Sequence, residues 1–440
     1  MTRRNPALMW RKTNAPVASS RTDDIWFVSA DVGWAVNSNG QILKTDDGGD
    51  TWTVQHQASS YLRCIGFAGD RIGWAGSVSG TRLFHTTNGG GNWAAVTNLP
   101  PTPAKICGLA VVDEQVIYAS GTNDPRDRPA VLKSVDGGAS WTSMDMSGQA
   151  ALLVDIHFET RDRGWVVGGR DAVACPGRPI TRDVVRPVVL FTEDGGASWT
   201  DLIPLSSQGN FPLGEWGWKI FFLNESVAFV SLENFRDGAI LKSVDGGMTW
   251  ERLRINDRQR NSNLEGVGFV SESVGWVGGW GDAEFTGGFT SQTSDGGENW
   301  DNANEVGFRL NRFRFFGDPV TVGYASGDTI YKYTTEPLVA GIARSPTMLA
   351  LMEPVQPLIV SLSPAELVVA VPAGSSSLRV ELWDRFGNRL EIAAEDAPAA
   401  GERAIHWTPD DAARADLLGN AAILRVTVDG SVESRLVPLA

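Results

Sequence analysis

Four acidic residues have side chains suited to glycoside hydrolysis: Asp155, Glu265, Asp282 and Glu284. A glycosidase of this kind places two carboxyl groups on opposite sides of the scissile bond, one of them protonated and the other ionised. The four residues are spread along the chain. This chemistry therefore requires a fold that brings two of them together on one surface.

Basic and aromatic side chains offer a second kind of site, a surface that binds a partner. Seven cations stand near expected strand starts or in long loops, in a chain whose formal charge is −14. They are Arg63, Lys105, Lys219, Arg258, Arg260, Arg312 and Arg314. Three tryptophans lie outside the repeated motifs: Trp216, Trp218 and Trp280. They are candidate anchors for a partner or platforms for a sugar, or else they fold over the edges of sheets.

Histidine and cysteine form no pattern typical of a catalytic triad, a metal site or a disulfide framework. The four histidines are scattered, and the three cysteines are widely spaced. They are His56, His85, His157 and His406, and Cys64, Cys107 and Cys175. We therefore expect no metal and no cofactor, and we interpret His157 as a side chain that lines a channel or a core.

One turn sequence, Ser/Thr-x-Asp-Gly-Gly-x-x-Trp, recurs six times, with Asn88 replacing the aspartate in the second copy. Its tryptophans stand 41 to 58 residues apart, a spacing typical of propeller blades. The six tryptophans are Trp52, Trp93, Trp141, Trp199, Trp250 and Trp300. The glycines supply positive-φ positions, the aspartate accepts backbone N–H bonds, and the tryptophan covers the hairpin. We call this turn the box and interpret it as a structural staple, not as a binding site.

A second motif, centred on an aromatic residue as in GWAV, runs in phase with the box but has seven copies. Its central residues are Trp34, Trp74, Tyr118, Trp165, Phe229, Trp276 and Tyr324. Each unit is expected to form four short strands, but the seventh has three strands and no box. A ring of sheets must close, because an open edge strand promotes aggregation. We predict that residues 8–15, with Trp10 in the place of a box tryptophan, complete the seventh blade.

The order of the strands sorts their connections onto two faces. The boxes and the short turns between first and second strands share one, which we call the box face. The connections between second and third strands and between blades share the other, the loop face. This face carries long insertions such as residues 121–130, 168–187 and 254–266. Long loops on a rigid scaffold often carry function, so we place the seven cations and three tryptophans there.

The boxes resemble the Asp-box repeat of bacterial neuraminidases. The joint pattern GWAV…G-x-ILKTDDGGDTW more closely resembles the photosystem II stability/assembly factor family of seven-bladed propellers, over residues 8–335. That resemblance implies the fold and non-enzymatic binding of a membrane-protein precursor, partly through an arginine-rich patch. The box also occurs in sialidases, xyloglucan-cleaving propellers and sortilin-type receptors, which keeps a glycan-directed function open. The assembly factors act in an exported compartment. This sequence has an early Arg pair but no apolar h-region, and we expect a cytoplasmic protein.

The remainder of the chain predicts a second, smaller β domain. Turn signals separate β-rich runs over residues 363–440, which is typical of a β-sandwich. This segment resembles the immunoglobulin-like domain of flagellar hook-capping proteins. Residues 336–362 contain four prolines and are predicted to be a linker. The expected fold class is all-β, with a propeller over residues 1–335.

These observations favour a binding protein over an enzyme. Sialidases carry a Phe/Tyr-Arg-Ile-Pro segment and a free tyrosine nucleophile; that segment is absent, and of five tyrosines only Tyr61 falls outside the expected strands. The acidic charge argues against nucleic acid, and no segment is apolar enough for membrane insertion. We predict a non-catalytic scaffold or assembly factor whose loop face binds an acidic segment of another protein. The alternative is a glycan-directed propeller, either lectin-like or hydrolytic.

Overall fold

The computed structural model describes residues 8–173, 179–204, 209–282, 285–335, 359–362, 366–383, 389–406, 421–429 and 431–438. These ranges consist of β-strands and connections, apart from short 3₁₀ turns such as Arg182–Val184. The all-β prediction is therefore confirmed. No helix within them is long and apolar enough to cross a bilayer. The chain divides into two compact units, Met1–Val17 with Arg21–Leu338, and Ala18–Ser20 with Val339–Ala440.

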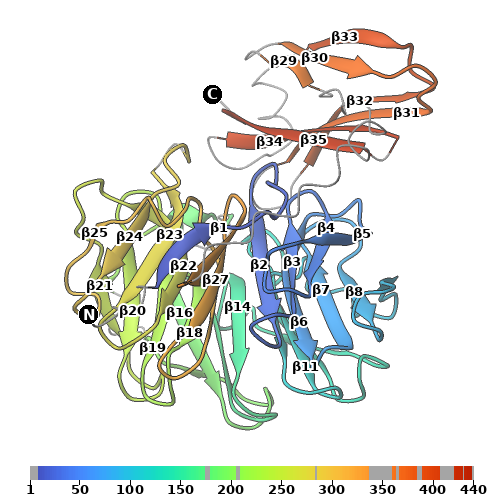
Figure 1. Ribbon diagram of the computed structural model, residues 1–440. Helices are drawn as coiled ribbons and strands as arrows, with labels where there is room; N and C mark the ends of the chain where they lie inside the picture. Colours follow the sequence, from blue (N-terminus) through green and yellow to red (C-terminus); the bar gives the residue numbers. More distant parts are fainter. Residues whose placement is uncertain are drawn as a thin grey trace. The chain divides into compact units, whose positions relative to one another are not determined.

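The first unit is a propeller of seven four-stranded antiparallel sheets (Figure 1). The first three blades are β2 (Thr22–Phe27), β3 (Gly33–Asn37), β4 (Gln41–Thr45) and β5 (Thr53–Gln57); β6 (Leu62–Ala68), β7 (Ile72–Ser77), β8 (Leu83–Thr86) and β9 (Ala94–Ala95); and β10 (Gly108–Val111), β11 (Ile117–Gly121), β12 (Ala130–Ser134) and β13 (Thr142–Asp145). The next three are β14 (Leu152–Phe158), β15 (Gly164–Asp171), β16 (Val185–Thr192) and β17 (Thr200–Asp201); β18 (Glu215–Phe222), β19 (Ala228–Asn234), β20 (Ala239–Ser243) and β21 (Glu251–Arg254); and β22 (Ser262–Phe269), β23 (Gly275–Gly281), β24 (Thr290–Thr293) and β25 (Asp301–Asn302). The seventh blade consists of β26 (Phe313–Phe316), β27 (Val322–Ser326), β28 (Ile330–Thr334) and a strand from the other end of the chain.

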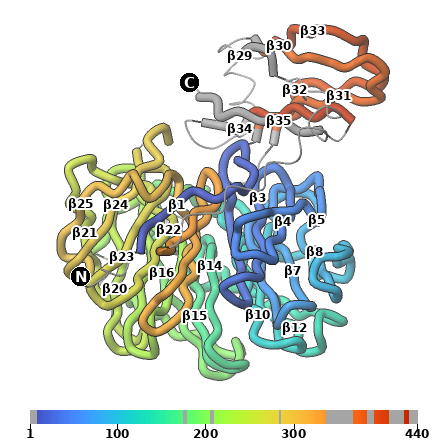
Figure 2. Tube along the Cα trace, viewed as in Figure 1, coloured from blue at the N-terminus to red at the C-terminus, as the bar shows by residue number. Residues whose placement is uncertain are grey.

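That closing strand is β1 (Met9–Lys12), which pairs antiparallel with β28 over four residue pairs. Figure 2 shows the blue β1 beside the orange end of the propeller. Trp10 stands where the other blades have a box tryptophan. The centroid of its ring lies 5.1 Å from that of Tyr333 and 5.4 Å from that of Trp276. Strand β28 is therefore paired on both sides, which closes the ring.

The fifth box shows how the turn itself is held. Gly246 and Gly247 have φ of +72° and +80°, a conformation that glycine adopts without a steric penalty. Asp245 Oδ1 accepts hydrogen bonds from the backbone N–H of Thr249 at 2.8 Å and of Met248 at 3.1 Å. Its Oδ2 accepts a bond from the Thr249 hydroxyl at 2.6 Å. The aspartate thus fixes the turn from within.

Each box is also bonded to the first turn of its own blade. In all six, the N–H of the first glycine donates to a carbonyl oxygen in the turn between the first and second strands, at 2.7–3.0 Å. The donor and acceptor pairs are Gly48–Asp31, Gly89–Arg71, Gly137–Gln115, Gly195–Asp162, Gly246–Ser226 and Gly296–Ser273. These bonds place both kinds of turn together on the box face.

A third set of bonds joins boxes to the preceding blade. Trp34 Nε1 in the first blade donates to the Gly89 carbonyl in the second, at 3.2 Å. Trp165 Nε1 donates in the same way to the Gly247 carbonyl, at 3.1 Å. Across the closing seam, Tyr324 OH donates to the Gly48 carbonyl at 2.9 Å. The two motifs that run in phase along the sequence are therefore partners across the seams between blades.

The second unit contains two further sheets. One has the order β29 (Ile359–Leu362), β30 (Glu366–Val371), β33 (Gly401–His406), and the other has the order β32 (Arg389–Asp396), β31 (Ser377–Trp383), β34 (Ala421–Val428), β35 (Ser431–Pro438). Leu367 and Val369 of the first sheet share one buried core with Val380 and Val426 of the second. This packing is typical of a sandwich, and the immunoglobulin-like resemblance stays a prediction. Strand β29 occupies the last residues of the predicted linker, and residues 336–358 lie outside the described ranges.

Candidate functional site

Three of the cations predicted to bind a partner lie inside the propeller. Arg63, Lys219 and Arg312 are 1%, 1% and 7% exposed. They lie on, or directly before, the first strands β6, β18 and β26, and their charges meet carboxylates from the first strands of other blades. The placement of these three on the loop face is therefore corrected: they are not accessible to a partner.

Arg312 joins three blades across the propeller. Its guanidinium donates to Asp155 at 2.7 and 3.0 Å and to Asp24 Oδ1 at 2.9 Å. Burial alone would raise the pKa of Asp155, but Arg312 and Lys219 outweigh burial and hold that pKa at about 2. The pKa of Arg312 is raised, because its two carboxylate partners outweigh its own burial. Arg312 and Asp155 are thus both ionised. Arg312 ties the seventh blade to the fourth through Asp155 and to the first through Asp24.

A second buried group joins the first, second and sixth blades. Asp23 accepts hydrogen bonds from Arg21 at 3.0 Å and from Arg63 at 3.1 Å. Arg21 also forms an ion pair with Glu265. Glu265 in turn accepts a bond from Trp280 Nε1 at 2.9 Å. Ion pairs this deep fix the arrangement of the blades, and removing one partner would leave a buried charge.

The three predicted tryptophan anchors are also corrected, because Trp216, Trp218 and Trp280 are 0%, 1% and 2% exposed. They lie in strands β18 and β23, not in loops. Trp218 Nε1 donates to Asn311 Oδ1 at 3.2 Å. Gly217, between Trp216 and Trp218, allows close packing, since a Cβ there would lie 3.1 Å from Val167 Cβ.

Two other predicted cations are also engaged within the fold. Lys105 forms ion pairs with Asp124 at 3.2 Å and Asp127 at 3.3 Å. The Arg314 guanidinium lies over the Trp26 ring, 4.8 Å from its centroid. Burial, with a smaller contribution from the charge of Arg312, lowers the pKa of Arg314 to about 10. Neither is a freely exposed cation.

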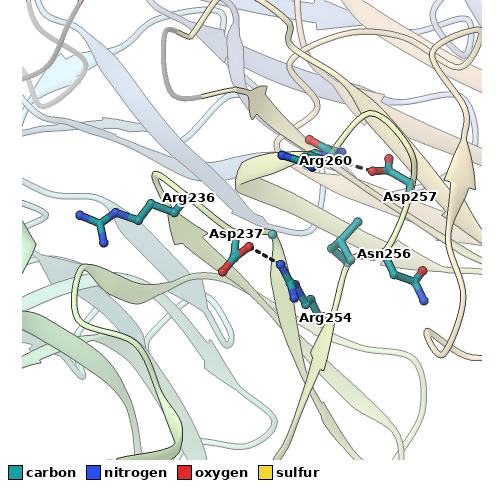
Figure 3. Close-up of a pocket in the computed structure, with 9 residues that line it drawn as sticks. Arg236, Asp237, Arg254, Asn256, Asp257 and Arg260 are labelled. Carbon is teal, nitrogen blue, oxygen red and sulfur yellow. Dashed lines mark hydrogen bonds and ion pairs between the residues drawn. The ribbon is translucent and has the colours of Figure 1, made fainter.

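Arg258 and Arg260 alone, among the ten predicted residues, are exposed to solvent. They lie in the connection from β21 to β22, on the loop face. This connection and the turn between β19 and β20 enclose a hollow of about 450 Å³ (Figure 3). The hollow is lined by Arg236, Asp237, Gly238, Arg254, Ile255, Asn256, Asp257, Arg260 and Asn261. Arg254 reaches Asp237 at 2.6 Å, and Arg236 extends outward on the other side.

Sequence reasoning missed Arg236 and Arg254 as site residues. Both are exposed, and both line the hollow. The signal that could have found them is topological, because a turn between second and third strands and a connection between blades share one face. Here the two segments come side by side because both flank the β20–β21 strand pair of the fifth blade.

Three of the four candidate catalytic carboxylates lie within the described residues, and each is engaged by other groups of the protein. Asp155 and Glu265 are fully buried in ion pairs. Asp282 caps a turn by accepting bonds from Thr286 N at 2.7 Å and Gly287 N at 2.6 Å. Glu284 lies outside the described residues. Two of the four are thus unavailable as an acid and a base for a sugar substrate.

His157 is half-buried and packs against an aromatic ring. It stacks on Phe222, with 4.5 Å between ring centroids, and burial lowers its pKa to about 4. In the part of the chain that the structure describes, no three His, Cys, Asp or Glu side chains gather as ligands for a metal ion.

The fold and the boxes define the first unit as a seven-bladed β-propeller of the BNR-repeat type. A family model described as photosynthesis system II assembly factor YCF48 matches residues 3–142. The photosystem II assembly lipoprotein Ycf48 of Synechococcus sp. (strain CC9902) is 26% identical over 266 residues, which are 54% of this chain and 76% of that protein. The predicted resemblance is therefore confirmed, and the propeller is Ycf48-like.

Solved structures extend the likeness of fold. YCF48 bound to D1 peptide aligns with a TM-score of 0.51 and 18% identity, over 76% of this chain and 100% of that one. YCF48 from Cyanidioschyzon merolae gives 0.53 and 18%, over 74% and 98%. A xyloglucanase from Paenibacillus sp is 27% identical over 56% of this chain, but the match spans only 27% of that protein. At these identities the structures show the fold alone.

Proposed function

We propose that this chain is a non-catalytic scaffold or assembly factor that binds another protein through the loop face of its propeller. One observation carries the proposal: exposed arginines gather around the hollow between the β19–β20 turn and the β21–β22 connection. Elsewhere on the propeller, the predicted cations are neutralised by carboxylates or packed on aromatic rings. Guanidinium groups left at the surface attract carboxylates, so the partner is expected to present an acidic segment.

The relatives support the same class of function. The Synechococcus protein is named an assembly lipoprotein, and one of the similar structures is of YCF48 bound to a D1 peptide. Those descriptions concern proteins that share 26% and 18% of their aligned residues with this chain. The partner of this chain is therefore proposed by its chemistry and not by name. Its cytoplasmic location also stays a prediction, since that relative is a lipoprotein.

Site-specific photocrosslinking in the source organism tests which face meets the partner. A benzoylphenylalanine at Arg258, on the loop face, is expected to form an adduct with another protein. The same residue at Val244, which is 67% exposed on the box face, is the matched control and is expected to form none. Adducts from Val244 alone would refute the loop-face scaffold.

The Paenibacillus relative keeps a glycan-directed function as a second candidate. We expect no release of reducing ends from xyloglucan and no turnover of aryl glycosides or sialosides, because Asp155 and Glu265 are sealed in ion pairs. Xyloglucan cleavage that disappears in Asp282→Asn would establish the alternative. Binding of xyloglucan without cleavage would instead indicate a lectin-like propeller.

A further inference from the structure

We propose that the hollow binds a carboxylate side chain of an extended peptide, and that Arg260 is the cation that selects for the charge. This inference rests on the proposed function, because it names the chemistry of the partner at the same face. It depends on three features of the hollow: the backbone conformation of Arg260, the engagement of its acidic neighbours, and an unused acceptor on Asn261.

Arg260 adopts a left-handed backbone conformation with φ of 55°. Its N–H donates to the Asp257 carbonyl at 3.3 Å, which forms a tight turn within the β21–β22 connection. Glycine takes this conformation without the clash that a Cβ introduces. The chain nevertheless carries a long cation there. A strained residue in a surface turn points to a use for its side chain, and here that side chain lies at the hollow.

The carboxylates of the acidic residues near Arg260 form their hydrogen bonds and ion pairs with other groups. Asp257 is 6% exposed, and its Oδ1 accepts a bond from Asn261 N at 3.1 Å while its Oδ2 accepts one from the Ser291 hydroxyl. Asp237 is paired with Arg254. Among the described residues, no carboxylate forms an ion pair with the side chain of Arg260. An incoming carboxylate is therefore its natural partner.

Arg254 can share that carboxylate. A guanidinium has five N–H donors, and the ion pair with Asp237 at 2.6 Å uses only part of them. The side chains of Arg254 and Asp237 are 67% and 44% exposed to solvent. The pair can therefore rearrange when a ligand enters.

Asn261 keeps one side-chain acceptor that no described residue satisfies. It lines the hollow and is 0% exposed, and its Nδ2 donates to Phe289 O at 3.3 Å and to Ser291 Oγ at 3.0 Å. Its Oδ1 has no hydrogen-bond partner among the described residues. A buried acceptor without a partner is costly unless a ligand satisfies it. A peptide offers an N–H donor for this acceptor in addition to a carboxylate for Arg260, whereas an inorganic anion offers only the charge.

The test compares two fluorescein-labelled peptides of equal length, one alternating glutamate with alanine and the other alternating glutamine with alanine. Binding is measured by fluorescence anisotropy, with inorganic phosphate as a competitor. The wild-type chain is expected to bind the glutamate peptide about tenfold more tightly, the effect of one charge-assisted hydrogen bond. Arg260→Gly should lose most of that preference, with a melting temperature unchanged or raised, because glycine relieves the strain.

Arg309→Gly is the matched control. Arg309 is also left-handed, with φ of 56°, but it pairs with Asp328 at 3.1 Å and does not line the hollow. This variant should keep the peptide preference of the wild type.

Equal affinity for the two peptides would overturn the inference, and so would a preference that survives Arg260→Gly. Phosphate that competes as well as the glutamate peptide does would reduce the hollow to a general anion site and would also overturn it. None of these results would change whether Arg258 forms a crosslink, so the two tests are independent. If the glutamate peptide shows no preferred binding while the Arg258 adduct forms, the proposed scaffold function is retained and only the ligand chemistry proposed for the hollow is rejected.

Discussion

The box face and the loop face of the propeller are held in different ways. On the box face, the same hydrogen bonds recur from blade to blade, within each box, from box to first turn, and from box to the preceding blade. On the loop face, a backbone bond such as that from Ile255 N to the Gly238 carbonyl recurs as Ala58 N to Gly40 O and Met146 N to Pro129 O. The side chains around it differ, however, and in the fifth blade they line the hollow. A face built from repeats keeps the ring rigid, and a face built from unlike loops can be specific.

Charge separates the two faces further. The thirteen turns of the box face carry eighteen acidic residues and three arginines. The acids are Asp31, Asp46, Asp47, Asp50, Asp70, Asp113, Glu114, Asp136, Glu159, Asp162, Glu193, Asp194, Glu225, Asp245, Glu272, Asp295, Glu298 and Asp318. These turns therefore carry a net charge of −15, slightly more negative than the formal charge of the whole chain, −14. Third-strand lysines, such as Lys133 and Lys242, offset part of it. The acidic partner proposed above would therefore be repelled from the box face and directed to the loop face.

The largest expected effect comes from a predicted cation that proved to be buried. Arg312→Ala should cost about 3–5 kcal/mol of unfolding free energy, because it leaves Asp24 and Asp155 buried without their partner. Chemical denaturation of the purified chain measures this cost. Arg312→Lys restores the charge and should recover part of the stability. If Arg312→Ala were as stable as Arg258→Ala, the conclusion that Arg312 is a buried structural cation and Arg258 an exposed one would be contradicted.

The closing seam gives the next largest effect. Tyr324→Phe removes a hydroxyl that donates to Gly48 O at 2.9 Å and to Ala30 O at 2.6 Å. The loss should be about 1–3 kcal/mol, since the single hydroxyl proton is shared between these two carbonyls and both lose their donor. Tyr118→Phe removes the equivalent hydroxyl from an internal seam, where it donates to Arg161 O and Gly195 O. Similar losses in the two variants would show that the closing seam is no weaker than an internal one, and a loss only at Tyr118 would contradict the closure described here.

Removing the aspartate acceptor of a box should cost less unfolding free energy than removing a hydrogen bond across a seam. Asp245→Ala is expected to cost about 1 kcal/mol through the lost turn bonds, and Asp245→Asn less, because Asn88 occupies this position in the second box. Thermal unfolding of both variants measures the difference. Neither should change what the chain binds, and a box variant that melts normally but loses its partner would reverse the interpretation of the box as a staple.

Acid should weaken the box face through the same aspartates. Hydrogen bonds from Thr249 and Ser243 outweigh a larger individual contribution from burial and hold the pKa of Asp245 at about 2, below its ordinary value of 3.8. A depressed pKa contributes stability that is full above pH 3.8 and is lost as the pH falls toward 2. The melting temperature should therefore drop over this window, and less steeply in Asp245→Asn. An identical slope in both would exclude Asp245 as a contributor.

The smallest effect on stability is expected on the loop face. Arg258→Glu should leave the unfolding free energy within about 0.5 kcal/mol, because the side chain is exposed. It should slow association with the partner, and low salt should enlarge that change. Glu225→Lys, on the box face, is the control and should leave the association rate near that of the wild type. A slower association rate in Glu225→Lys alone would indicate that the partner binds the box face and would contradict the proposed loop-face site.

The sequence by itself determined the repeated parts of this protein. Six boxes and seven aromatic strands are local patterns, because a turn of eight residues contains its own glycines and its own acceptor. They predicted seven blades and the strand that completes the last one. They also predicted that box and aromatic motif recur together, although not that they are bonded across the seams.

Only the tertiary structure decided which charges face solvent. Arg312 meets Asp155 across 157 residues and Asp24 across 288. Nothing local distinguishes that arginine from Arg258, which has the same side chain and stands in an equally irregular stretch. The first strand of each blade lies at the centre of the ring, where a cation must find a carboxylate, whereas a connection between blades lies at the surface, where water solvates it. The hollow beside Arg260 exists for the same reason, since it forms only when two segments separated by a whole strand pair are brought side by side.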